Sequence, residues 1–196
     1  RFGIPVMSSN MTTITEYKMA KTMSDLGGLG VIHRFMDIDQ QISISLELLK
    51  SGTEVVCNSV GSVHNDKNRI KAILENIRYD KSIICVDIAH GHSIHMKDTL
   101  QYIRDLAFTG HVIAGNVATP EGVLDLASWG ASVIKVGIGS GAVCTTRVKT
   151  GVGWPQLTSI ALARHILDRE GFSNDVSICA DGGIRTAGDA CKALAA

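Results

Sequence analysis

The sequence lacks an excess of charge of either sign. Its 196 residues include 19 Lys and Arg against 19 Asp and Glu, so the formal net charge is zero. A balanced chain gives no electrostatic reason to expect nucleic acid or a membrane surface as a partner. No apolar run approaches the length of about 20 residues that crosses a bilayer. Residues 1–5 also lack the charged and apolar blocks of a secretion signal, so we expect a cytoplasmic protein.

Paired-cysteine motifs are absent as well. The chain has five cysteines, an odd number, and no two of them have the C-x-x-C spacing. Three of them, Cys57, Cys85 and Cys179, lie in apolar runs, where a small buried side chain is the expected role. Reduced thiols in a cytosolic protein fit this pattern best. Cys144 differs, because it follows a run of glycines and precedes two threonines, which is typical of a loop.

The chain does contain enough apolar material for one well-packed domain, since 45% of its residues are hydrophobic. Short runs rich in Val and Ile, typical of parallel strands buried on both faces, alternate with longer helical patterns. The predicted strands cover residues 4–8, 29–33, 54–59, 82–87, 111–114, 133–136 and 176–180, and the predicted helices cover residues 15–25, 38–49, 65–76, 96–106, 120–129, 156–168 and 186–195. We expect Thr15 and Thr119 to cap two of these helices, with Pro120 at a first helical position.

Repeated strand–helix units predict a parallel sheet with right-handed crossovers. We expect an incomplete α/β fold of the TIM (β/α)8 barrel type, in which about seven units are present and the last is missing. It would form a single catalytic domain over residues 1–196, truncated at its C-terminal end and without an inserted regulatory domain. An open, doubly wound sheet is the structural alternative.

The longest connection between predicted strands follows residues 133–136 and contains Cys144. Barrel folds place their chemistry in such loops at the C-terminal ends of strands. Glycines at positions 137, 139 and 141 let the backbone approach a ligand closely, and carbonyls facing inward could hold a monovalent cation. Lys135 and Arg147 would favour the thiolate of Cys144, and Thr146 could position a water or an amine. A glycine-rich turn with an incidental cysteine is the alternative.

Polar residues also follow other predicted strands. Asp181 precedes Gly182 and Gly183, a turn whose backbone N–H groups could cradle a phosphate while the carboxylate binds a ribose diol. A tight strand-to-helix turn is the alternative reading of these three residues. Asp87 and Asn116 end two further strands and are expected at the same mouth of the barrel.

Three histidines, His90, His92 and His95, invite a metal interpretation. Their spacing on a loop is not a known ligand pattern and no cluster of carboxylates accompanies it, so we do not expect metal catalysis there. Polar residues at 8–10 and 33–34 end the first two predicted strands, which again places polar side chains at one end of the sheet.

The most specific motif, KVGIGSGAVCTTR, covers residues 135–147, and supporting motifs lie at residues 5–11, 86–93, 114–117 and 180–184. On these motifs, the chain resembles the catalytic barrel of the IMP dehydrogenase and GMP reductase family along essentially its whole length. The resemblance implies an oxidoreductase of purine nucleoside monophosphates, and the family suggests a homotetramer.

The resemblance also implies roles for individual residues. Cys144 would attack C2 of the purine to form a thioimidate, and Thr146 would help to move a proton at the water or ammonia. The substrate would be held by Ser9, Met11, Asp181, Gly182 and Gly183. The nicotinamide dinucleotide would contact Arg34, Asp87, Ile88, Ala89, Asn116, Ile138 and Gly139. Backbone carbonyls of Gly139, Gly141 and Cys144 would bind a potassium ion.

Within the family, the chain looks closer to GMP reductase, which converts GMP and NADPH into IMP, ammonia and NADP. Residues 40–50 run directly into the next predicted strand, with no room for the regulatory tandem domain that is usual in dehydrogenases. Lys149 after a Val and Trp154 before a Pro also look reductase-like. Residues 27–34 and 180–185 instead look like the NAD-dependent dehydrogenases that oxidise IMP to XMP, and this assignment is the alternative.

Two positions depart from the family pattern. Ala142 stands where the family usually has a Ser that contacts the phosphate, and Thr12 replaces the usual Asp after Met. The family's region beyond the predicted strand at 176–180, with the catalytic Glu of reductases or the mobile Arg-Tyr flap of dehydrogenases, is not in this sequence. Two other functions stay open: a truncated nucleotide-binding protein without activity, and a flavin-dependent barrel enzyme, because an Asp-Gly-Gly turn also resembles FMN phosphate sites.

Overall fold

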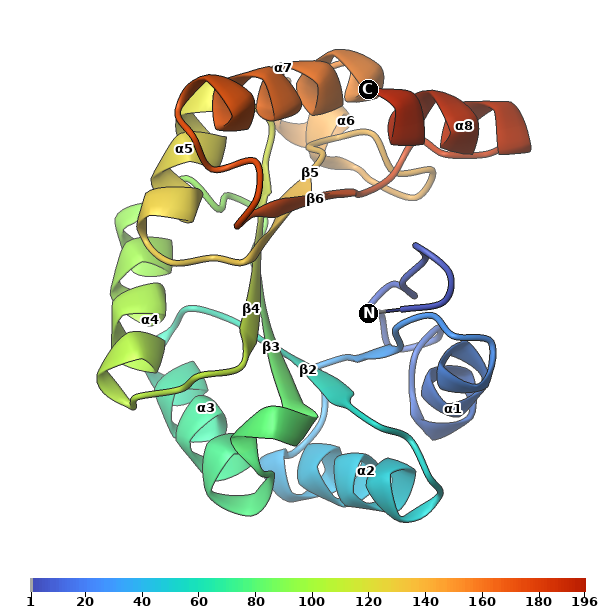
Figure 1. The fold of residues 1–196 in the computed structure, drawn as a ribbon, viewed down its shortest axis with the longest axis vertical. Helices are drawn as coiled ribbons and strands as arrows, with labels where there is room; N and C mark the ends of the chain where they lie inside the picture. The colour runs from blue at the N-terminus through green and yellow to red at the C-terminus, as the bar shows by residue number, and fades with distance from the viewer. Residues whose placement is uncertain (1) are drawn as a thin grey trace. The chain divides into compact units, whose positions relative to one another are not determined.

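The computed structural model describes residues 2–196, in which strands and helices alternate along most of the chain (Figure 1). In chain order the elements are α1 Tyr17–Asp25, β1 Val31–Ile32, α2 Ile38–Lys50, β2 Val56–Val60, α3 His64–Asn76, the 3₁₀ turn η1 Tyr79–Lys81, β3 Ser82–Asp87, α4 Ile94–Asp105, β4 His111–Val117, α5 Pro120–Ser128, β5 Val133–Val136, α6 Thr146–Thr150, α7 Gln156–Arg169, β6 Ser177–Ala180 and α8 Ala187–Ala195. This alternation is the one that the hydrophobic pattern predicts.

Within the described residues the six strands form one sheet, in the order β1-β2-β3-β4-β5-β6. The neighbours are parallel: Val56 of β2 lies opposite Ser82 of β3, and Val133 of β5 lies opposite Ser177 of β6. Chain order equals spatial order, so each connection crosses to the adjacent strand, as in a barrel. A doubly wound sheet would reverse its strand order at a switch point. The predicted α/β class and parallel sheet are therefore confirmed.

The contacts of the chain group into two compact units. The first comprises the chain as far as Val86 together with Tyr102–Val112, and the second comprises Asp87–Gln101 together with Ile113–Ala196. The first unit has a core of fully buried aliphatic side chains that includes Ile32, Leu48, Ile70 and Ile73. The second unit is built in the same way, with Met96, Leu126, Ile134 and Leu167 buried. That both units belong to one barrel domain over residues 1–196 stays a prediction.

The predicted strand at residues 4–8 is wrong as an extended element. Only an isolated bridge joins Met7 to Leu29, with hydrogen bonds from Ser8 N to Leu29 O and from Leu29 N to Val6 O. Residues 2–196 thus contain six strands rather than the predicted seven. The physical reason lies in burial: Val6 is more than half exposed, so this segment does not have a strand's covered faces.

The two predicted helix caps have different outcomes. Thr119 is confirmed, since its hydroxyl accepts a hydrogen bond from Gly122 N at 3.2 Å and Pro120 occupies the first turn. The prediction for Thr15 is wrong, because Glu16 occupies the cap position of α1 and its side chain forms no capping hydrogen bond. The Thr15 hydroxyl is instead hydrogen-bonded to Ser8 Oγ at 2.8 Å and to Ser9 O at 2.6 Å.

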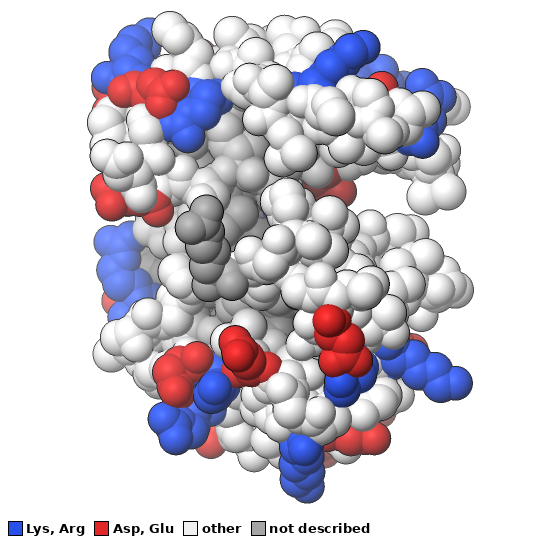
Figure 2. Space-filling model, turned by 45° about the vertical axis from the view of Figure 1, so that its right-hand side comes forward, with Lys and Arg blue, Asp and Glu red and all other residues white. Residues whose placement is uncertain are grey.

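Charged side chains of both signs are interspersed on the face that Figure 2 shows, in keeping with the zero net charge. No large group of Lys and Arg alone gathers on that face. Among residues 2–196, no helix combines the length and apolar character that a membrane span requires.

We predict that Thr119→Ala destabilises the protein by about 1 kcal/mol, because the first turn of α5 loses the acceptor for Gly122 N–H. Urea unfolding followed by circular dichroism measures the change. Thr119→Ser keeps a hydroxyl at the cap and is expected to stay close to the parent. Equal midpoints for the Ala and Ser variants would show that the cap contributes nothing.

Candidate active site

Cys144 lies on the loop between β5 and α6, in the second compact unit. Its side chain is exposed, and its amide donates to the carbonyl of Gly141 at 3.1 Å, which closes a tight turn. The sulfur lies 3.2 Å from Thr146 Oγ1, at the start of α6. The expectation of a solvent-accessible thiol next to a hydroxyl group therefore agrees with the structure.

The surroundings of Cys144 favour its thiolate. The hydrogen bond with the Thr146 side chain, followed by a bond to the Thr146 backbone, holds the pKa of this thiol below its ordinary value. The positive charge of Arg147 acts in the same direction. Arg147 itself is fixed by donating from its guanidinium to Trp154 O at 2.6 Å. A thiol with a lowered pKa and open access has the properties of a nucleophile.

Lys135 was predicted from the sequence to be a second cation near Cys144, but in the structure it pairs with two carboxylates. The side chain of Lys135 is 6% exposed, and its ammonium lies 2.9 Å from Asp87 Oδ1 and 3.1 Å from Asp181 Oδ2. Asn116 Nδ2 also donates to Asp181 Oδ2, at 2.7 Å. The prediction that Lys135 activates the cysteine is therefore wrong. Lys135 instead belongs to a buried network with Asp87, Asp181 and Asn116.

The Cys144 loop packs directly against the turn that contains Asp181. Ser140 Oγ donates to Asp181 O at 2.9 Å. Gly182 has a φ of +83°, and a Cβ there would lie 2.8 Å from Gly141 N. Gly137 has a φ of +149°, and a Cβ there would lie 2.0 Å from Asp181 O. Only glycine permits these conformations and distances, so glycine brings the two predicted segments into contact.

The residues predicted for the dinucleotide have distinct places in the second unit. Asp87 is half-buried and Ala89 is exposed just beyond β3. Ile88 uses its backbone within the sheet, donating to Gly115 O and accepting from Asn116 N, each at 2.9 Å. Only its side chain is therefore left to meet a ligand. Ile138 and Gly139 lie on the loop after β5, and their role in binding stays a prediction.

The Asn116 side chain, which was predicted to contact the dinucleotide, forms hydrogen bonds within the protein. Its Nδ2 donates to Gly137 O at 2.8 Å as well as to Asp181. Its Oδ1 is buried and accepts no hydrogen bond from the described residues, which leaves one acceptor of this network without a donor. Such an atom is costly unless a donor reaches it on ligand binding or from water.

The carbonyl groups predicted for potassium lie on the same loop. Gly139 has a φ of +75°, and Gly141 O accepts the Cys144 amide with one of its two lone pairs. A second lone pair remains, and uncharged carbonyl oxygens suit a monovalent cation. No group of three or more His, Cys, Asp and Glu side chains converges within residues 2–196. Of the three histidines, His92 lies 2.8 Å from Asp125 Oδ2.

Ser9, Met11 and Arg34 belong to the first compact unit, and their roles stay predictions. Ser9 O accepts from Met11 N at 2.9 Å, and the Met11 side chain is 43% exposed. The Arg34 guanidinium lies 5.0 Å from the centre of the Phe35 ring.

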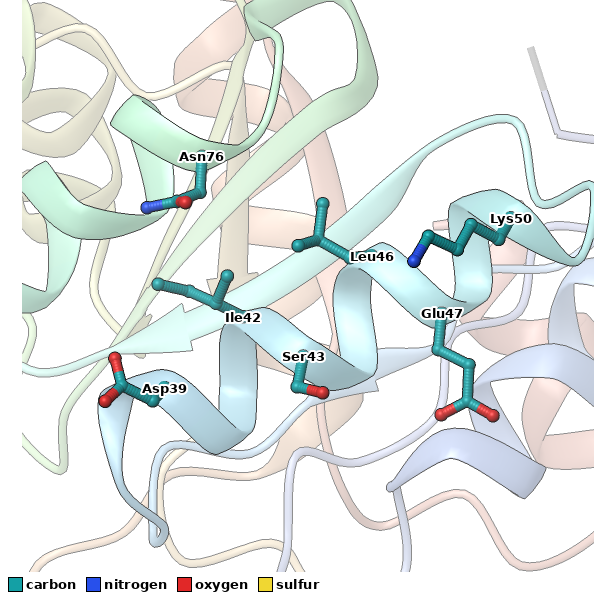
Figure 3. A pocket seen from close by; sticks show the side chains of 7 residues that line it. All are labelled: Asp39, Ile42, Ser43, Leu46, Glu47, Lys50 and Asn76. Carbon is teal, nitrogen blue, oxygen red and sulfur yellow. The ribbon is translucent and has the colours of Figure 1, made fainter.

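A groove of about 420 Å³ is also present in the first unit, between one face of α2 and Asn76 of α3. Figure 3 shows its lining, in which Asp39, Glu47 and Lys50 accompany aliphatic side chains of α2. None of the predicted site residues lines it, so it adds nothing to the chemistry of Cys144.

Gln156 is a site residue that sequence analysis missed. Its Nε2 donates to Val136 O at 2.7 Å, which ties the start of α7 to the end of β5. A Cβ at Gly137 would lie 2.8 Å from its Oε1. The only signal in the sequence is a polar residue after Pro155 at a helix start, and that pattern suits an ordinary surface helix equally well.

We predict that Thr146→Val moves the pH dependence of Cys144 alkylation to higher pH. Without the hydroxyl, the thiolate loses a hydrogen bond and the pKa of Cys144 rises, so less thiolate is present at a given pH. Iodoacetamide labelling with peptide mass spectrometry measures the rate at each site. The exposed Cys191 on α8 is the internal control, and its profile is expected to be the same in both proteins.

The three less accessible thiols should remain unlabelled in the native protein. Cys57 and Cys85 are buried, and Cys179 is partly buried. Desolvation, with the Asp181 carboxylate as a second cause, raises the pKa of Cys179 to about 11. An identical pH profile for Cys144 in the parent and in Thr146→Val would contradict the assigned role of the hydroxyl.

The chain is similar to proteins of known family. The family model described as "IMP dehydrogenase / GMP reductase domain" matches residues 1–196. The chain is 38% identical over 196 residues to the GMP reductase of Buchnera aphidicola subsp. Schizaphis graminum, covering 98% of this chain and 54% of that protein. It is 36% identical over 195 residues to the GMP reductase of Edwardsiella ictaluri, with the same coverage.

Among solved structures, the inosine 5′-monophosphate dehydrogenase from Legionella pneumophila superposes with a TM-score of 0.84 and 43% sequence identity. The match covers 99% of this chain and 55% of that one, so the chain spans about half the length of the relatives it matches. The fold is therefore that of a (β/α)-barrel fragment. With a family model that covers every residue, the chain belongs to the IMP dehydrogenase and GMP reductase family.

Proposed function

We propose that the protein is a purine nucleotide oxidoreductase that converts GMP into IMP with NADPH, through a thioimidate on Cys144. The observation that carries the proposal is an exposed thiol of lowered pKa on a loop that packs against the Asp181 turn. Family membership and the reductases among its relatives support this substrate class.

The proposed chemistry is nucleophilic catalysis. The Cys144 thiolate attacks C2 of the purine, and a C–S bond forms at the carbon that carries the amino group. The amino group gains a proton and leaves as ammonia, and Thr146 is close enough to the sulfur to pass that proton. A bound NADPH supplies a hydride to C2. The C–S bond then breaks with its electron pair returning to sulfur, so GMP, NADPH and one proton give IMP, NADP⁺ and ammonia.

The nucleotide would be bound by the turn after β6. The Asp181 carboxylate is half-buried and suits a ribose diol, while Gly182 and Gly183 expose backbone that suits a phosphate. Ala142 offers no hydroxyl, so this phosphate site relies on backbone N–H groups. Ser9 and Met11 would hold the base.

The described residues also fit the dinucleotide and potassium. Asp87 would accept from the nicotinamide ribose, with Arg34, Ala89 and the side chain of Ile88 as further contacts. The buried Oδ1 of Asn116 offers an acceptor that receives no hydrogen bond from residues 2–196. Gly139, Gly141 and Cys144 would hold a potassium ion through carbonyl oxygens and so fix the Cys144 turn.

One observation favours a second candidate, the NAD-dependent oxidation of IMP to XMP. The dehydrogenase from Legionella pneumophila is 43% identical to this chain, above the 38% of the Buchnera reductase. In this reaction the same thiolate attacks C2, a hydride leaves C2 for NAD⁺, and water then displaces the sulfur.

Product analysis distinguishes the two candidates. The protein is incubated with GMP and NADPH, or with IMP and NAD⁺, in the presence of potassium, and the purines are separated by chromatography. We expect IMP and ammonia from the first pair. XMP from the second pair alone would assign the dehydrogenase reaction instead, and nucleotide binding without product or adduct would favour a binding protein.

We predict that Cys144→Ala abolishes turnover and the covalent adduct, because no other exposed thiol lies on this loop. Cys191→Ala removes the other exposed thiol and is the matched control, expected to keep both properties. Intact mass spectrometry after incubation with nucleotide detects the adduct. Full turnover by Cys144→Ala would rule out the covalent mechanism.

A further inference from the structure

Lys135 is the most deeply buried charge in the second unit's candidate site. It lies on β5 with 5% of its surface exposed, and its ammonium contacts the Asp87 and Asp181 carboxylates at 2.9 and 3.1 Å. We propose that Lys135 is a positioning residue that holds both carboxylates and thereby couples the purine nucleotide site to the dinucleotide site. The inference deepens the proposed function and rests on it, since Asp181 and Asp87 are the residues assigned to the two ligands.

The register of the sheet places Lys135 between the two carboxylates. Lys135 lies opposite Gly115 of β4 on one side and opposite Cys179 of β6 on the other. A Cβ at Gly115 would come within 2.5 Å of Lys135 Cβ, so the glycine leaves room for the lysine stem. Because β5 pairs with a strand on each side, the backbone that carries Lys135 has a fixed position.

The positive charge of Lys135 keeps the two carboxylates close together. Two carboxylate oxygens lie within about 3 Å of one nitrogen, so the two acids are close neighbours. Without the ammonium, the like charges of the two partly buried carboxylates repel each other, and the carboxylates move apart. Asn116 restrains Asp181 from another side but carries no charge to offset this repulsion.

The consequence is a shared dependence of the two ligand sites. Replacing Asp181 removes an acceptor for the nucleotide, and replacing Asp87 removes one for the dinucleotide. Replacing Lys135 misplaces both acceptors at once, because Lys135 acts through the two carboxylates. If Lys135 had only a structural role, its replacement would not be expected to weaken these two ribose contacts in particular.

The test compares Lys135→Met with the parent by isothermal titration of GMP and, separately, of NADPH. We predict that both dissociation constants rise by about tenfold or more, since a buried pair loses one partner. Lys135→Arg keeps the charge and is expected to recover part of both affinities. Lys71→Met, at an exposed lysine that pairs with Glu75 on α3, is the control expected to match the parent.

A double variant gives a readout that depends on charge alone. Lys135→Met/Asp87→Asn removes the second negative charge, so Asp181 loses its repelling neighbour and GMP affinity is expected to recover relative to Lys135→Met. NADPH affinity is expected to stay low, because the Asp87 acceptor is altered. This asymmetry holds even where Lys135→Met lowers overall stability, which circular dichroism monitors.

The outcomes separate the two proposals. A parent protein that binds neither nucleotide overturns the proposed function and the role of Lys135 with it. A parent that binds both ligands, with Lys135→Met altering one affinity or none, overturns the role of Lys135 alone. Failure of the double variant to regain any GMP affinity also overturns it.

Discussion

The candidate site depends on a close approach between two backbone segments. The loop after β5 and the turn after β6 touch where Gly137 faces Asp181 O and where Gly182 faces Gly141 N. These distances leave no space for a side chain, and the positive φ values exclude most other residues. Because the contact involves backbone, it fixes the loop more firmly than side chains alone could. The position of Cys144 relative to Asp181 follows from that contact.

The two cations near the candidate site, Lys135 and Arg147, have different roles. Lys135 is committed to Asp87 and Asp181, so the cysteine is activated by Thr146 and Arg147 instead. The division has a physical reason, since a buried ammonium needs nearby carboxylates, whereas an exposed thiol can be adjusted by one hydroxyl and a more distant cation. On the proposed function, recognition and bond formation thus rely on separate groups within the second unit.

The sequence predicts those features that depend on local pattern. The bounds of β3 and β5 agree with the prediction at both ends, because short runs rich in Val and Ile become buried strands. Thr119 is recognised as a cap because Pro120 marks the helix start. Asp87, Asn116 and Asp181 could be placed together because the carboxyl ends of parallel strands meet at one edge.

Features that depend on tertiary packing could not be predicted in this way. Thr15 has the composition of a cap, yet Ser8 and Ser9 offer it partners that only the fold brings near. Lys135 reads as a free cation in sequence, and its two acids come from strands far away along the chain. The short helix α6 has no buried face, so the sequence contains no hydrophobic periodicity that would predict it.

The two candidate reactions differ in fewer groups than their names suggest. Both need a thiolate at C2, a ribose contact and a hydride acceptor or donor next to the same carbon. They differ in whether ammonia leaves C2 before a hydride arrives or water attacks after a hydride has left. Thr146 stands beside the sulfur in either case, so it could serve both proton transfers. On the proposed function, these residues would carry the chemistry that the two reactions share, and the chain resembles both a dehydrogenase and reductases.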